Sequence, residues 1–146
     1  AQVIGALVRP SGISEEQLLI WEQTDLRCDT EGVEAQVRDL LRQVRELQRL
    51  ESEKAEIARK QSVDTNRVKK IFENQSRLRE NIKSMEHVRT GTLLERYMND
   101  MDKEENELIQ TRSRLEQFEE AKANSEREVG KLVLQISMAA KSVQKR

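Results

Sequence analysis

The sequence has few of the residues from which compact catalytic or disulfide-rich domains are built. Its 146 residues include one cysteine, one proline, one histidine and five glycines, and aromatic side chains make up 3%. A lone cysteine cannot form an internal disulfide or a multi-cysteine metal site, and it fits a reducing compartment, so we expect a cytoplasmic protein. No apolar run approaches the roughly 20 residues that a membrane-spanning helix needs.

An excess of charge of one sign is also missing. The 26 basic residues nearly cancel the 27 acidic ones, which leaves a net charge of −1. Balanced charge gives no attraction to nucleic acid or to an anionic membrane, so a curved membrane-binding module is the weakest function class. Hydrophobic residues make up only 36% and charged residues another 36%. Because the apolar residues are regularly spaced, this composition indicates long, solvent-exposed helices joined along narrow seams.

The N-terminal region differs in pattern from the rest of the chain. Residues 1–13 hold the one β-like stretch, "AQVIGALVRP", which has no partner strand within the chain. We therefore expect residues 1–13 to be a strand remnant or linker. Residues 14–28 are expected to form a short helix, because Ser14 followed by Gln17 is an N-capping pattern. Its apolar side chains are Leu18, Leu19 and Trp21.

Two long segments carry a seven-residue apolar repeat. In residues 29–88 the repeat slips by three residues between Leu47 and Leu50, which is the kind of insertion called a stammer. In residues 93–144, seven of the eight positions spaced seven apart are apolar: Leu94, Met101, Leu108, Leu115, Lys122, Val129, Ile136 and Val143. This regularity predicts two long helices of the coiled-coil type.

Gly91 decides between one continuous helix and a hairpin. If the chain turns at residues 89–92, the two residue numbers of every facing pair should have nearly the same sum. Apolar residues then meet, as Met85 with Leu94, Leu78 with Met101, Ile71 with Leu108, and Leu50 with Val129. Between them Lys54 faces Glu126. We therefore predict an all-α fold: a long antiparallel two-helix coiled-coil hairpin, with the short N-terminal helix and the strand remnant.

The residue types that most often act in catalysis or metal binding are expected to have no such role here. His87 lies at the expected hairpin tip, where no partner is available for catalysis or metal binding. Cys28 has no histidine near it in sequence. The acidic run of residues 99–107 lacks the calcium-loop pattern and is expected to be a solvated helical face. Two helices side by side form no deep pocket, so we expect no enzyme activity, no cofactor and no metal.

Polar residues at seam positions are expected to fix the alignment of the two helices rather than to do chemistry. These residues are Gln61, Asp64, Gln75, Glu105 and Glu119. The basic residues of 67–83 suggest an alternative function, a nucleic-acid-binding arm. Glu73 and Glu80 interrupt this stretch, and no aromatic ladder accompanies it for stacking on bases. We therefore prefer protein as the partner.

Apolar residues that lie off the seam predict contacts with protein. Phe72, Ile109 and Phe118 are expected to line one side of the hairpin and to bind a second copy or the remainder of a larger protein. Near the other end, Leu132 belongs to a stretch too apolar for one partner helix to cover, and Trp21 is expected to cover part of it. The function expected from these patterns is that of a structural or protein-interaction arm.

Two short motifs carry a resemblance. The first, "NQSRLREN", places Gln75, Arg77, Leu78, Arg79, Glu80 and Asn81 in order, and the second places Arg96 and Tyr97 before Glu104 and Glu105. Both are similar to the C-terminal coiled-coil region of the mucoidy inhibitor A-like proteins, a family whose main domain has no known function. The resemblance covers residues 14–140. It implies a larger parent protein with a β-rich domain, which agrees with a first residue other than methionine, and it transfers no functional residues.

Overall fold

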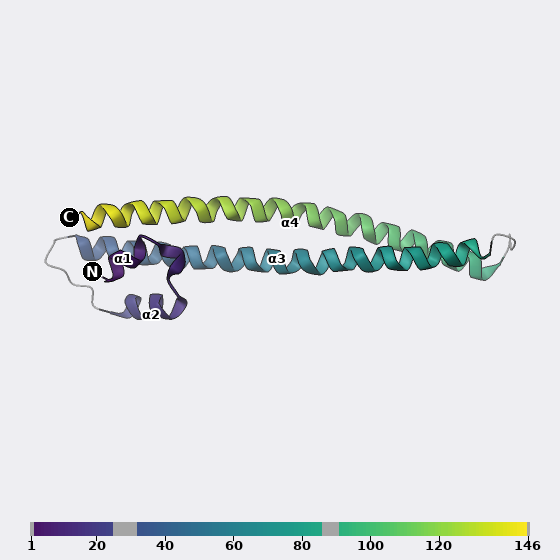
Figure 1. Cartoon of the computed structure of the whole chain (residues 1–146), viewed down its shortest axis with the longest axis horizontal. Helices are drawn as coiled ribbons and strands as arrows, with labels where there is room; N and C mark the ends of the chain where they lie inside the picture. The colour runs from purple at the N-terminus through teal and green to yellow at the C-terminus, as the bar shows by residue number, and fades with distance from the viewer. Residues whose placement is uncertain (1, 25–31, 86–90, 146) are drawn as a thin grey trace. The chain divides into compact units, whose positions relative to one another are not determined.

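A computed structural model describes residues 2–24, 32–85 and 91–145. Every regular element in these ranges is helical: α1 (Gln2–Leu7), the 3-10 helix η1 (Pro10–Gly12), α2 (Glu15–Gln23), α3 (Val33–Lys83) and α4 (Thr92–Gln144). The two long helices pack against each other in opposite directions (Figure 1). The predicted all-α helical hairpin is therefore confirmed.

The N-terminal strand predicted within residues 1–13 is wrong. Gln2–Leu7 is α-helical and Pro10–Gly12 is a 3-10 helix. A helix brings Val3, Ile4 and Leu7 to one side, and all three pack into an apolar core in which Leu7 is fully buried. A strand would have found no partner for its backbone, so burial decided the conformation against the β-like composition.

Helix α2 begins where the capping pattern predicts. The Ser14 Oγ accepts a hydrogen bond from the backbone N–H of Gln17 at 3.1 Å. The helix ends at Gln23 instead of continuing to residue 28. Residues 25–31, and with them Cys28, lie outside the described residues.

The boundaries of the long helices also differ from the expected ones. Helix α3 begins at Val33 rather than at residue 29, directly after Gly32, whose φ of +83° lies in the left-handed region that favours glycine. Helix α4 begins at Thr92, one residue before the expected start, and ends at Gln144 as expected. The hairpin tip, residues 86–90, lies outside the described residues.

The chain divides into two units, which are described separately. The basal unit comprises residues 1–56 and 123–146, and the paired-helix unit comprises residues 57–122. The basal unit holds α1, η1 and α2 with the first part of α3 and the last part of α4. Its core consists of Leu7, Ile13, Leu18, Val33, Val37, Leu40, Leu41, Val44, Leu47, Ile136, Ala140 and Val143.

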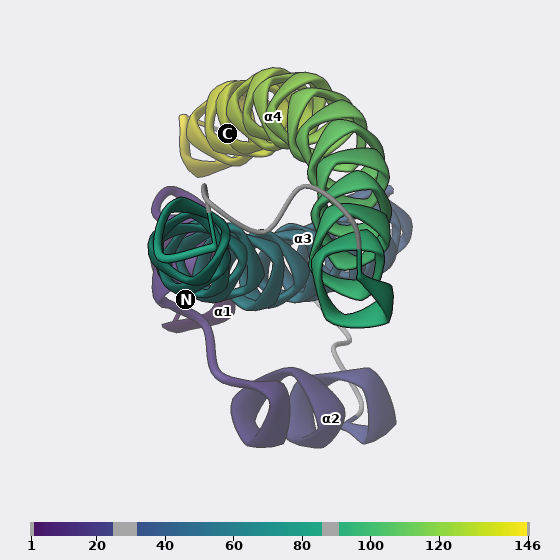
Figure 2. The same cartoon turned by 90° about the vertical axis from the view of Figure 1, so that its right-hand side faces the viewer.

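Within the basal unit, α2 lies on the side of α3 opposite to α4 (Figures 1 and 2). Arg38 Nη1 donates a hydrogen bond to the backbone carbonyl of Glu22 at 2.6 Å, and Arg45 forms an ion pair with the Glu22 carboxylate. Gln48 Nε2 donates to the backbone carbonyl of Ile13 at 3.1 Å. These contacts attach the short helices to α3.

The paired-helix unit buries a narrow seam of mixed character. Among its described residues, the buried apolar ones are Ile71, Leu78 and Leu108, and all three occupy predicted repeat positions. The same helices also bury polar side chains: Asp64, Gln75 and Thr111. Polar layers of this kind give up some stability and favour one alignment of the helices over others.

Candidate functional site

The predicted alignment of α3 with α4 is confirmed by hydrogen bonds between seam residues. Gln61 Nε2 donates to the Glu119 carboxylate at 2.7 Å, and Gln75 Nε2 donates to the Glu105 carboxylate at 3.0 Å. All four residues were predicted to set the register. Each bond joins one helix to the other, so a shift of either helix along its axis would break both.

A third polar layer holds the most buried ionic group of the paired-helix unit. Asp64 accepts hydrogen bonds from Arg114 Nε at 3.1 Å and from Arg114 Nη2 at 3.3 Å. The Asp64 side chain is only 10% exposed, and the same Nη2 donates to Thr111 Oγ1 at 3.2 Å. The hydrogen bond to Asp64 raises the pKa of Arg114 above its ordinary value. Sequence reasoning identified Asp64 but missed Arg114, which lies off the seam and reaches it through a long side chain.

The basal unit contains the predicted ionic pair between Lys54 and Glu126. Lys54 Nζ lies 3.9 Å from Glu126 Oε1, and both side chains are well exposed to solvent. The pair therefore agrees with the alignment, but an exposed ion pair of this length stabilises the fold by at most about 1 kcal/mol.

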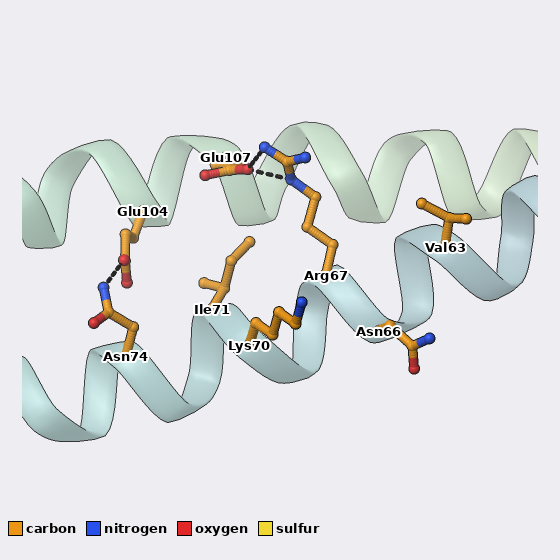
Figure 3. A pocket seen from close by; sticks show the side chains of 8 residues that line it. All are labelled: Val63, Asn66, Arg67, Lys70, Ile71, Asn74, Glu104 and Glu107. Carbon is orange, nitrogen blue, oxygen red and sulfur yellow. Dashed lines mark hydrogen bonds and ion pairs between the residues drawn. The ribbon is translucent and has the colours of Figure 1, made fainter.

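An open groove of about 550 Å³ runs beside the seam of the paired-helix unit (Figure 3). Two bridges cross it from α3 to α4: Arg67 forms an ion pair with Glu107, and the Asn74 side-chain amide donates to Glu104. The other lining residues are Val63, Asn66, Lys70 and Ile71. Neither bridge was predicted from the sequence, because none of the four residues follows the seven-residue repeat.

Glu104 lines this groove and is partly buried. Its Oε2 atom is buried without a hydrogen-bond partner among the described residues. Burial raises the pKa of Glu104, and the nearby charge of Glu107 adds to this effect. An acid of raised pKa in a cleft can mark a catalytic site, but ion-pair networks between helices produce the same shift. Within the described ranges, no three histidine, cysteine, aspartate or glutamate side chains are grouped so that they could hold a metal ion.

Three of the six basic residues of 67–83, the arginines, form contacts within the chain. Arg67 pairs with Glu107. Arg77 donates to Asn74 Oδ1 at 2.8 and 3.0 Å, and Arg79 Nε donates to the backbone carbonyl of Gln75 at 3.4 Å. All three arginines of this stretch therefore have intramolecular acceptors. These contacts favour a structural role for the stretch.

The predicted apolar stripe does not lie on one side. Phe72 and Ile109 are 41% and 61% exposed, and the Arg112 guanidinium lies 5.4 Å from the centre of the Phe72 ring, a cation–π contact. Phe118 follows Ile109 by nine residues, which is two and a half helical turns, so it faces the opposite way on α4. It lines a separate groove with Val63. The expectation that Phe118 shares a side with Phe72 and Ile109 is therefore wrong.

The other two predicted interaction residues belong to the basal unit. Trp21 and Leu132 are partly buried and pack against its core. Trp21 packs against this core from α2, and both residues are engaged within the chain. That Trp21 covers the stretch containing Leu132 stays a prediction. The apolar residues of α4 that face outward in this unit are Leu134 and Met138.

No family model, curated protein or solved structure matches the chain. The resemblance to the mucoidy inhibitor A-like family therefore stays a prediction. His87 and Cys28 both lie outside the described residues. Of the helices that the structure describes, none has the length and apolar character required to cross a membrane.

Proposed function

We propose that the chain is a non-enzymatic protein-interaction arm of a larger protein, in which α3 and α4 pair as an antiparallel coiled coil. Phe72, Ile109 and Arg112 form its contact surface, which we call the Phe72 flank. The observation that carries this proposal is an exposed aromatic ring, Phe72, in cation–π contact with Arg112, which lies one helical turn from the exposed Ile109 on α4.

The polar layers support the proposal by fixing the surface that the arm presents. Gln61 and Gln75 each bond across the helix pair, and Asp64 is held by two nitrogens of Arg114. Apolar seams tolerate shifts in register, whereas buried polar pairs penalise them by leaving polar groups without partners. Side chains on the outside of α3 and α4 then keep one relative placement, as a specific binding surface requires.

The composition of the Phe72 flank also supports a protein partner. Aromatic residues and arginine are enriched at protein interfaces and dominate their binding energy. The cation–π contact of Arg112 limits the conformations open to the Phe72 ring, so less conformational entropy is lost on binding. Nucleic acid would instead require a row of basic residues with free charges.

The proposal is tested by replacing Phe72 and Ile109 together with Gln. Both side chains are substantially exposed, so the variant should keep its helix content and melting temperature while it loses partner binding, measured by quantitative affinity capture against defined candidate proteins. Val63→Gln is the matched control, because Val63 is exposed to a similar degree but lies on the side of α3 opposite to Phe72. Equal binding by the double variant and the unmodified chain would refute the role of this flank. Salt-dependent binding of labelled RNA or DNA by the unmodified chain would favour the nucleic-acid alternative instead.

A further inference from the structure

Helix α2 presents an outward surface that the fold of the basal unit does not use. Leu19 and Ile20 are 50% and 57% exposed, whereas Leu18 on the inner side is fully buried. Helical spacing places Glu16 and Gln23 beside them, and Glu15 is also exposed. We call this surface the acidic face: Glu15, Glu16, Leu19, Ile20 and Gln23.

The last part of α4 presents a surface of opposite charge. Leu134 and Met138 lie one helical turn apart, and each is 61% exposed. Basic residues surround them at helical spacing, and no aspartate or glutamate follows Glu128 in the sequence. We call this surface the basic face: Arg127, Lys131, Leu134, Met138, Lys141 and Lys145.

An apolar groove of about 570 Å³ adjoins the basic face. It lies between the turn that contains Val8 and Pro10 and the part of α4 that contains Gly130 and Leu134. Glycine is unfavourable inside a helix, and a Cβ atom at Gly130 would meet no other atom within 4 Å. Packing within the described chain therefore does not require glycine here. Its missing side chain leaves room for an apolar side chain from another molecule.

We propose that the acidic face of one copy of the chain docks on the basic face and groove of a second copy. Leu19 or Ile20 would enter the groove, and Glu15 and Glu16 would meet the lysines and the arginine of the basic face. Opposite charge steers two such surfaces together and fixes their orientation, while the apolar residues supply most of the binding energy. The contact is separate from the Phe72 flank and does not depend on the function proposed for that flank.

The placement of α2 determines the form of the assembly. Because α2 lies on the side of α3 opposite to α4, it cannot cover the groove of its own chain (Figures 1 and 2). The two faces are unlike and point in different directions. A contact between unlike faces of this kind joins copies head to tail, so it builds open chains, or a ring where the rotation between copies closes, rather than a dimer with one shared face.

A membrane surface and a nucleic acid fit the basic face less well. Helices that lie in a membrane interface bury a large apolar face, often with tryptophan or phenylalanine. The outward apolar content of the basic face is Leu134 and Met138 alone, because Leu132, Val133 and Ile136 pack on the core. A nucleic acid would gain nothing from the two apolar side chains between the basic ones.

The test uses two variants of the chain, each lacking one face. The first carries Leu19→Gln with Ile20→Gln, and the second carries Leu134→Gln with Met138→Gln. All four side chains are exposed, so circular dichroism should show both variants to be fully helical. Leu93→Gln with Met98→Gln serves as the matched control, since it removes two exposed apolar side chains of α4 that belong to neither face. Sedimentation velocity at increasing concentration measures the mass of each chain alone and of the two face variants mixed in equal amounts.

We expect the unmodified chain and the control to form assemblies whose mass rises with concentration and falls at high salt. Each face variant alone should bind itself at least roughly tenfold more weakly, because a single altered face breaks every contact. The equimolar mixture should give a 1:1 dimer, since one acidic face and one basic face remain intact.

A monomeric unmodified chain at high micromolar concentration, or a mixture that stays monomeric, would overturn the proposal. So would binding of the monomeric chain to anionic lipid vesicles through Leu134 and Met138. Loss of assembly in the control to the same extent as in the face variants would also overturn it, because the effect would then not be specific to the two faces.

Discussion

Arg114 of α4 donates hydrogen bonds from two nitrogens to the carboxylate of Asp64 on α3, at 3.1 and 3.3 Å. The carboxylate is almost completely buried, whereas the arginine keeps close contact with solvent. Such a pair contributes less to stability than its geometry suggests, because burying the carboxylate is costly. Its larger effect is on alignment, since Asp64 has a partner in one register only.

Removing Arg114 should therefore destabilise the fold more than removing other surface arginines. Arg114→Ala leaves Asp64 buried without its partner, and we expect a loss of about 1–3 kcal/mol in the free energy of unfolding, measured with urea. Arg96→Ala, at an exposed position of the same helix, should change it by less than about 0.5 kcal/mol. Similar losses in the two variants would show that Asp64 does not depend on Arg114.

The hairpin alignment is open to direct chemical measurement. Cysteines that replace Leu78 and Met101 should crosslink within one chain under mild oxidation, because these positions face each other in the register set by Gln75 and Glu105. Cysteines at position 78 and at Leu115 should not crosslink, since α4 carries residue 115 far along its axis. Spin labels at positions 78 and 101 that lay several nanometres apart would contradict the alignment.

Glu104 should make stability depend on pH. Burial raises the pKa of Glu104, so the folded state binds this proton more tightly than the unfolded chain does. The stabilisation that protonated Glu104 provides is complete below the pKa of a glutamate in the unfolded chain, about 4.3. It is lost as the pH rises through the higher pKa of Glu104 in the folded state. Glu104→Gln should therefore raise the urea midpoint at pH 7 and change it little at pH 3. The exposed control Glu116→Gln should change neither. A lower midpoint for Glu104→Gln at pH 7 would mean that the charged form is the stabilising one.

The short helices should be integral to the basal unit. Leu18→Ala removes a fully buried side chain, and we expect a loss of about 2–5 kcal/mol in unfolding free energy. Leu19→Ala, next to it but half exposed, should cost less than about 1 kcal/mol when measured on dilute protein. Equal and small effects would mean that α2 does not pack on α3.

The long helices could be predicted from sequence because one signal, the seven-residue repeat, is both local and strong. It identified Gln61 and Glu119 as seam residues that fix the alignment, and the structure joins them by a hydrogen bond. The first helix could not be predicted in this way. Its six residues have β-like composition, and the burial of Leu7 against residues of α3 and α4 determines its conformation.

The outer surface was also only partly predictable. A repeat identifies what lies on the seam, but residues off the seam occupy two opposite flanks, and apolar character alone does not distinguish them. Ile109 and Phe118 were placed together for this reason, although nine residues of helix separate their directions by half a turn. Arg114 was missed because the length of its side chain, rather than its repeat position, brings it to Asp64.

Binding of protein by the Phe72 flank can be measured by site-specific photo-crosslinking. A photoreactive amino acid at position 72 should give discrete adducts with a second protein chain, and addition of unmodified chain should reduce their yield by competition. The same amino acid at position 63 is the matched control, because Val63 is exposed on the other side of α3. We expect adducts from position 72 and few from position 63. No interchain adduct from position 72, or equal yields from the two positions, would contradict it.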